Sequence, residues 1–145
     1  LDLEKFRFEN KFDYIIETAN SINLEVNVPK MIIQTFVENA VKHGLVPKPG
    51  KGMLTVRIRE ENDFLDITID DNGIGRDEAS KINAGSTGKG IEIMNEFIAL
   101  LNSYNEKKIR FEINDIPGDM KSVAGTHVSI KLPVNFTYNS IIKTQ

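Results

Sequence analysis

The hydrophobic residues of this chain recur with two different periods. Where they alternate with polar residues, every second side chain points to the same face, which is the pattern of a half-buried strand. This alternation predicts strands at residues 12–17, 53–59, 64–70, 108–113 and 126–132. The short polar segment at residues 60–63 favours a hairpin between the second and third of these strands.

Two other segments repeat their hydrophobic residues every three or four positions, which predicts helices. The first helix is expected at residues 27–44, with Pro29 suited to its opening turn and Gly44 to its end. The second is expected at about residues 91–102. Residues 72–90, before the second helix, are polar and glycine-rich and do not alternate, so we expect a loop there.

These elements predict the fold class α/β, as an α+β two-layer sandwich. The sheet is expected to be mixed but mostly antiparallel, with about five strands, two or three helices on one face and an open second face. We expect residues 1–134 to form a single domain and residues 135–145, which have no clear period, to form a C-terminal tail.

Composition narrows the class of protein. With 145 residues, 40% hydrophobic and 27% charged, the chain has the profile of one soluble globular domain. The absence of cysteine excludes disulfides and thiol catalysis, and two histidines are too few for a histidine-rich metal centre. A net charge of −3 predicts no general attraction to nucleic acid. The first residue is not Met, so we expect a piece of a longer protein.

Polar residues follow one stripe of the first predicted helix. Thr35, Asn39, Lys42 and His43 are spaced by four, three and one residues, so they lie near one another on the helix surface. A carboxamide oxygen and a cation one turn apart can seat a hydrated Mg²⁺ ion and phosphate oxygens. The alternative is a polar helix face with solvated Lys and His side chains.

A second cluster follows the third predicted strand. Asp71 comes at the strand end with its carboxylate available as an acceptor, and Gly73 and Gly75 allow a ligand to approach the backbone closely. The dipeptide Asn72-Gly73 is also a strong hairpin signal. Because residues 76–85 do not alternate, a binding loop fits better than a hairpin turn.

A third cluster, at residues 85–90, looks like a phosphate-binding loop. Only two residues separate Gly85 from Gly88, and Gly90 stands where a Walker motif needs Ser or Thr, so that motif is excluded. The segment instead reads as a loop that delivers backbone N–H groups to the start of a helix. A fourth cluster, Gly125-Thr126, is by itself typical of an ordinary turn.

In this order the clusters resemble the ATP-binding domain of the GHKL superfamily (gyrase, histidine kinases, MutL), which has the Bergerat fold. The N box corresponds to residues 38–44, the first glycine box to 71–75, the second to 88–90 and the Gly-Thr pair to 125–126. Residues 1–14, Pro29 and residues 34–44 are most similar to LytS-type bacterial sensor histidine kinases. The resemblance covers roughly residues 1–134.

The resemblance implies two cofactors, ATP and Mg²⁺. Asn39 would hold Mg²⁺ between the nucleotide phosphates, with Lys42 and His43 nearby as phosphate partners. The backbone at Gly88 and Gly90 would bring a lid and the N-terminus of the next helix to the phosphates.

The adenine would be bound at the other end of the site. Asp71 would accept the hydrogen bond of the adenine amino group and so discriminate adenine from guanine. Gly73 and Gly75 would make room for the nucleotide, and Thr126 would help to bind adenine, often through a water.

The function implied is that of the catalytic domain of a two-component sensor histidine kinase. It would transfer the γ-phosphoryl group to a histidine on an upstream dimerisation segment outside this chain, from which it would pass to a response regulator. The resemblance further implies a homodimeric full-length protein, anchored in the bacterial inner membrane with this domain in the cytoplasm. His43 and His127 are not expected to be the acceptor, and His127 is predicted to be an edge-strand side chain.

One departure and two alternatives stay open. Thr35 stands where gyrase-type ATPases have a water-activating Glu, and Glu38 lies about 100° round the helix from Asn39, so we expect poor hydrolysis. One alternative is an anti-sigma-factor-type serine kinase, against which residues 4–12 argue. The other is a catalytically degenerate nucleotide-binding scaffold.

Overall fold

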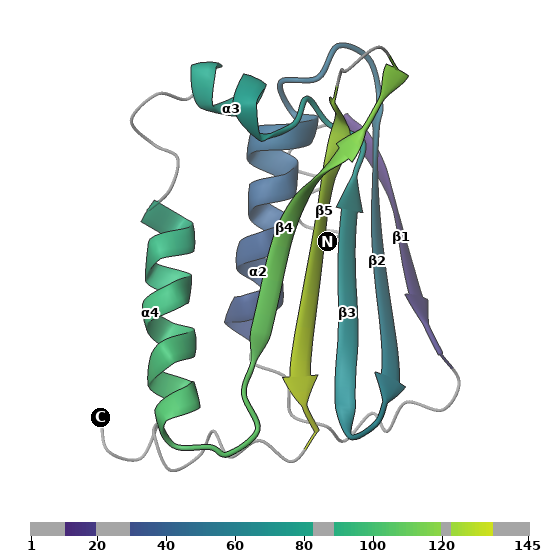
Figure 1. The fold of residues 1–145 in the computed structure, drawn as a ribbon. Helices are drawn as coiled ribbons and strands as arrows, with labels where there is room; N and C mark the ends of the chain where they lie inside the picture. The colour runs from purple at the N-terminus through teal and green to yellow at the C-terminus, as the bar shows by residue number, and fades with distance from the viewer. Residues whose placement is uncertain (1–10, 20–29, 83–88, 120–122, 135–145) are drawn as a thin grey trace.

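A computed structural model describes residues 11–19, 30–82, 89–119 and 123–134 (Figure 1). One five-stranded sheet has the order β1-β2-β3-β5-β4. Its strands are β1 (Phe12–Thr18), β2 (Gly52–Glu61), β3 (Phe64–Asp71), β4 (Arg110–Pro117) and β5 (Val123–Pro133). β1 pairs with β2 in parallel, and every other neighbouring pair is antiparallel. The predicted mixed, mostly antiparallel sheet is confirmed.

The helices lie on one side of this sheet, as Figure 1 shows for α2 and α4. The helical elements are α2 (Lys30–Asn39), the π-helix η1 (Ala40–Leu45), α3 (Arg76–Ile82) and α4 (Lys89–Ser103). The prediction of one regular helix to Gly44 is therefore wrong beyond Asn39, where the backbone widens into a π turn.

The loop expected at residues 72–90 contains the short helix α3, which periodicity alone did not reveal. Asp77 and Glu78 stand in its first turn, where negative charge favours the helix N-terminus. Lys81 in its last turn forms an ion pair with Glu78 at 2.9 Å. Such charge placement stabilises a short helix that has too few hydrophobic residues for a visible repeat.

The hairpin predicted between β2 and β3 is confirmed. Asn62 and Asp63 both have positive φ, at 52° and 65°, and the flanking residues Glu61 and Phe64 pair directly. Two consecutive residues with positive φ are the requirement of a type I′ turn, which suits the twist of the strands.

The core lies between the sheet and the helices. On the central strand β3, Leu65, Ile67 and Ile69 are at most 2% exposed and alternate with partly exposed Asp66, Thr68 and Asp70. Helix α2 contributes Ile32 and Phe36, and the Phe36 ring packs against that of Phe111 on β4 with centroids 5.1 Å apart. Burial of this hydrophobic face supplies the main force that holds the two layers together.

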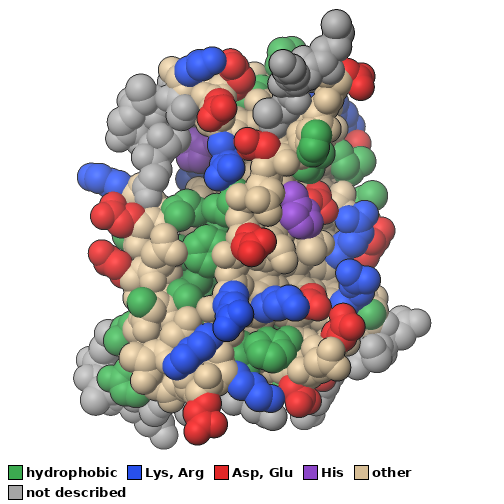
Figure 2. All heavy atoms as spheres, viewed as in Figure 1, with side chains coloured by type: hydrophobic (Ala, Val, Ile, Leu, Met, Phe, Trp, Pro, Cys, Tyr) green, Lys and Arg blue, Asp and Glu red, His purple; other side chains and the backbone are tan. Residues whose placement is uncertain are grey.

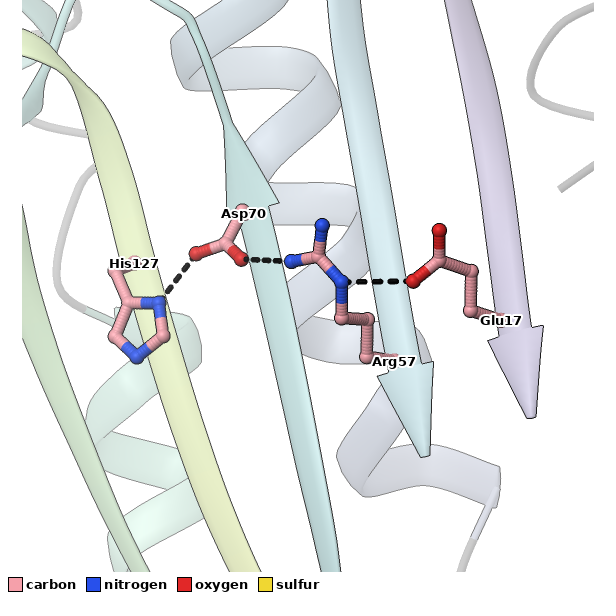
Figure 3. A network of polar contacts seen from close by, with 4 residues as sticks. All are labelled: Glu17, Arg57, Asp70 and His127. Carbon is pink, nitrogen blue, oxygen red and sulfur yellow. Dashed lines mark hydrogen bonds and ion pairs between the residues drawn. The ribbon is translucent and has the colours of Figure 1, made fainter. Parts of the chain in front are cut away.

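The other face of the sheet is covered by charged and polar side chains (Figure 2). Arg57 on β2 bonds Glu17 on β1 at 2.8 Å and Asp70 on β3 at 3.2 Å, and Asp70 also contacts His127 on β5 (Figure 3). β5 lies between β3 and β4, so the prediction that His127 is on an edge strand is wrong. The carboxylate that contacts His127 is that of Asp70 on the neighbouring strand β3, a pairing that the sequence pattern did not reveal.

Truncation of Phe36, whose ring packs helix α2 against the sheet, should destabilise the fold. We expect Phe36→Ala to lower the free energy of unfolding by about 3–5 kcal/mol, because it leaves a cavity in the core. The matched control is Leu100→Ala on α4, where the side chain is 41% exposed, and a change below about 1 kcal/mol is expected. Urea denaturation measures both, and equal losses would contradict this description of the core.

Candidate nucleotide-binding site

The first group of predicted site residues lies where α2 passes into η1. Asn39 is the last residue of α2 and has helical backbone angles, with φ −62° and ψ −45°. In η1, the N–H of Val46 donates to the carbonyl of Val41 at 2.9 Å, a bond spanning five residues as a π-helix requires. The single stripe predicted for a regular helix thus holds for Thr35 and Asn39, whereas Lys42 and His43 follow the wider turn. π turns inside α-helices occur frequently at functional sites.

The start of α4 lies beside Asn39. A Cβ atom placed on Gly90 would be 3.9 Å from the Oδ1 atom of Asn39. Since Gly90 is the second residue of α4, the free N–H groups of this helix and the Asn39 carboxamide meet in one place. Gly88 lies outside the described residues, so only this part of the predicted lid can be placed.

His43 has an unusual environment in η1. Its Nδ1 atom is buried and has no hydrogen-bond partner among the described residues. Burial lowers the pKa of His43, and the positive charge of Lys42 lowers it further by a smaller amount, so the ring is neutral at pH 7. Lys42 itself is exposed. The unused Nδ1 atom is therefore enclosed by the protein and does not face solvent.

Asp71 ends β3 and is 4% exposed, the only buried ionisable side chain in the described parts of the chain. Burial raises its pKa to about 6, although backbone hydrogen bonds from Gly73 and Thr126 act in the opposite direction. The Gly73 N–H donates to Asp71 Oδ1 at 2.8 Å. Thr126 stands directly opposite Asp71 in the β3–β5 pairing. A carboxylate so poorly solvated is a strong acceptor for a donor on a ligand.

Glycines surround this carboxylate because no side chain would fit. A Cβ atom on Gly44 would come 2.8 Å from Asp71 Oδ1, and one on Gly73 would come 2.4 Å from the Gly44 backbone. At Gly125, which has φ +139°, a Cβ atom would lie 1.8 Å from the Asp71 carbonyl oxygen. Gly75 is the last residue before α3 and has φ +84°, which also favours glycine.

Several residues that complete this arrangement were not predicted from the sequence. Gly44 was interpreted as a helix stop at the end of the N box, with no role at Asp71, yet it packs against Asp71 and its carbonyl accepts the N–H of Ile74 at 3.1 Å. Lys48 donates to the Asn72 carbonyl at 2.5 Å, and Asn72 Oδ1 accepts the N–H of Met53 at 2.7 Å. These contacts join segments distant in the chain, so no local pattern marks them.

The predicted residues therefore form two groups that Gly44 connects. One contains the Asn39 carboxamide and the start of α4, with Lys42 and His43 following Asn39 along η1, and can bind oxygen-rich anions with a hydrated cation. The other contains Asp71, Gly73 and Thr126, and can accept a hydrogen bond from a nitrogen donor. In the described residues, no three His, Asp or Glu side chains gather as a metal cluster, and no helix is long and apolar enough to cross a membrane.

Comparison with known proteins agrees with this geometry. A family model described as histidine kinase-, DNA gyrase B- and HSP90-like ATPase matches residues 26–135. The sensor histidine kinase YpdA of Escherichia coli (strain K12) is 30% identical over 130 residues, covering 90% of this chain and 18% of that protein. The sensor protein LytS of Staphylococcus haemolyticus is 30% identical over 140 residues, covering 92% and 22%. The chain thus spans about a fifth of the length of these relatives.

Two solved structures share the fold. A mycobacterial sensor histidine kinase, MprB, has a TM-score of 0.59 at 16% identity, covering 90% of this chain and 88% of that chain. The catalytic domain of the histidine kinase ThkA has a TM-score of 0.56 at 16% identity, covering 91% and 88%.

The raised pKa of Asp71 predicts a pH dependence of stability. The folded state holds this proton more tightly than the unfolded chain, whose value is 3.8, so the Asp71 contribution is lost as pH rises from about 4 to 6. The Asp71→Asn variant has no carboxyl group that titrates at this position, so its stability does not fall for this reason as pH rises. We therefore expect the variant to gain stability relative to the wild type over this interval, by at most roughly 3 kcal/mol. Urea denaturation at several pH values tests this, and a difference that does not change with pH would contradict it.

Proposed function

The chain belongs to the family of histidine kinase-, DNA gyrase B- and HSP90-like ATPases, and from this premise we propose that it is the ATP-binding catalytic domain of a sensor histidine kinase. Residues 1–134 form this domain and residues 135–145 its tail. The observation that carries the proposal is the buried Asp71 carboxylate, which can accept a hydrogen bond from the adenine amino group. Guanine has a keto oxygen at that position, which is itself a hydrogen-bond acceptor and so could not bond to the Asp71 carboxylate.

The residues at the two ends of the site fit Mg-ATP. Asn39 would hold Mg²⁺, Lys42 and His43 would contact the phosphates, and the N-terminus of α4 at Gly90 would supply backbone N–H groups. The closeness of Gly90 to Asn39 supports this assignment. The metal would supply charge neutralisation between phosphate oxygens. Gly88 would belong to the lid.

The other end of the site would hold the base. Asp71 accepts the amino hydrogen bond, and Thr126, paired with it across β3 and β5, would bind adenine through a water. Gly75 would leave room for the nucleotide, whereas the Cβ position of Gly73 is only 2.4 Å from the Gly44 backbone, so that glycine is required by packing. The close packing of Gly44, Gly73 and Gly125 against Asp71 and one another supports an acceptor that is held in place before a ligand binds.

The chemistry proposed is phosphoryl transfer rather than hydrolysis. Thr35 offers no carboxylate to activate water, and the Glu38 carboxylate accepts a hydrogen bond from Gln34 at 3.1 Å. The domain would position the γ-phosphoryl group for a histidine on an upstream dimerisation segment, mainly by orientation and electrostatics. A response regulator would then receive it. The parent would be a homodimer anchored in the bacterial inner membrane, with this domain in the cytoplasm.

Nucleotide binding is the first consequence to test. Calorimetric titration of the non-hydrolysable analogue AMP-PNP with Mg²⁺ should show binding, with GTP unable to compete. Asp71→Asn should weaken binding roughly 10- to 100-fold, because a hydrogen bond to a charged acceptor is lost. Asn39→Ala should weaken binding and reduce its Mg²⁺ dependence.

The matched control is Asp70→Asn, the neighbouring carboxylate on the opposite face of β3, which should change the affinity less than twofold. Absence of binding at millimolar nucleotide in the folded wild-type chain would overturn the proposal. It would leave the degenerate scaffold as the better account.

The acceptor residue separates the kinase alternatives. We expect the full-length parent protein, incubated with Mg-ATP, to carry phosphate that is labile to acid and stable to alkali, as on histidine. Asn39→Ala in the parent should abolish this labelling. Acid-stable phosphoserine on a separate substrate would instead support an anti-sigma-factor-type serine kinase.

A further inference from the structure

The peptide group between Asn72 and Gly73 has a polar partner at each end. Its N–H, on Gly73, donates to Asp71 Oδ1 at 2.8 Å, and its carbonyl, on Asn72, accepts from the Lys48 ammonium at 2.5 Å. Both bonds belong to one planar, resonance-stabilised unit. A cation on the carbonyl oxygen therefore polarises the N–H and strengthens its bond to the carboxylate.

Lys48 is itself held in place by main-chain contacts. Its N–H donates to the Leu45 carbonyl at 3.2 Å, and its own carbonyl accepts from the Lys11 ammonium at 2.7 Å. The bonds therefore tie the segment after η1 to the start of the sheet. Lys48 is of intermediate exposure as a residue, and the bond from its ammonium to the Asn72 carbonyl lies at the surface.

The turn after β3 is held from its other side by Met53. The Asn72 N–H donates to the Met53 carbonyl at 3.2 Å, and the Asn72 side chain accepts the Met53 N–H at 2.7 Å. With both backbone groups and the side chain of Asn72 in use, rotation of the Asn72–Gly73 peptide would break several bonds at once. Lys48 supplies the only contact among these that carries a positive charge.

We propose that Lys48 is a positioning residue for adenine recognition: through the Asn72–Gly73 peptide it fixes the orientation of the Asp71 carboxylate. The proposal rests on the function proposed above, since it concerns the same acceptor. Lys48 also acts electrostatically to lower the pKa of Asp71, against the effects of burial and of Asp70, the other charged residue that influences this carboxyl. His43 in η1, which packs over this end of β3, is neutral at pH 7 because its pKa is lowered.

The test uses three variants of the whole chain. Lys48→Met removes the charge and the donor but keeps an unbranched side chain of similar length, and Lys48→Arg retains both. Lys51→Met is the matched control, because Lys51 is in the same loop but is exposed and pairs with Asp13 at 3.0 Å. The ligands are ATP and purine riboside triphosphate, which lacks the amino group that Asp71 would bind.

Lys48→Met should weaken ATP binding about tenfold, the size expected for a charged hydrogen bond, and purine riboside triphosphate binding less than twofold. Lys48→Arg should recover most of the ATP affinity, and Lys51→Met should not change it. Equal losses for both nucleotides would overturn the proposal, because a general structural role would affect them alike.

Nuclear magnetic resonance of the nucleotide-free chain gives an independent measure. In Lys48→Met the Gly73 amide proton should move upfield and the Asp71 carboxyl carbon should titrate at higher pH; unchanged signals would overturn the positioning role. If the wild-type chain binds neither nucleotide, the proposed function fails, and these two signals alone decide whether Lys48 positions Asp71.

Discussion

The arrangement of the site depends on the burial of one carboxylate at the end of the central strand. Asp71 loses most of its hydration, and its stabilising partners among the described residues are backbone groups of Gly73 and Thr126. Removal of an acid from water costs free energy that only close, correctly oriented donors offset. The backbone on both sides must therefore approach closely, and this requires glycine at positions 44, 73 and 125.

The same close approach connects the two ends of the site. η1 ends with Gly44 packed against Asp71 and Leu45 fully buried, so the position of Asn39, at the start of this turn, is set relative to the carboxylate. The wider π turn shifts the residues after Asn39 from a regular helical stripe. The proposed metal and phosphate end and the proposed adenine end would thus be held at a defined separation through the packed backbone of η1.

Most of the fold could be predicted from the sequence, because alternation and helical periodicity report local burial directly. All five strands, the hairpin at residues 60–63 and the second long helix appear where the pattern indicated. The π turn and α3 could not be predicted, since Gly44 in the π turn packs against a distant strand and α3 has charged ends rather than a hydrophobic repeat. Among the site residues, Asp71 was visible as an acid after a buried strand, whereas Lys48 and Asn72 act through contacts between distant segments.

The most direct test of the account is a crystal structure of the chain with Mg²⁺ and AMP-PNP. We expect the adenine amino group within hydrogen-bonding distance of the Asp71 carboxylate, and the metal in contact with the Asn39 carboxamide oxygen beside the N-terminus of α4. A nucleotide bound with its base away from Asp71, or on the open face of the sheet where Asp70 and His127 lie, would contradict it.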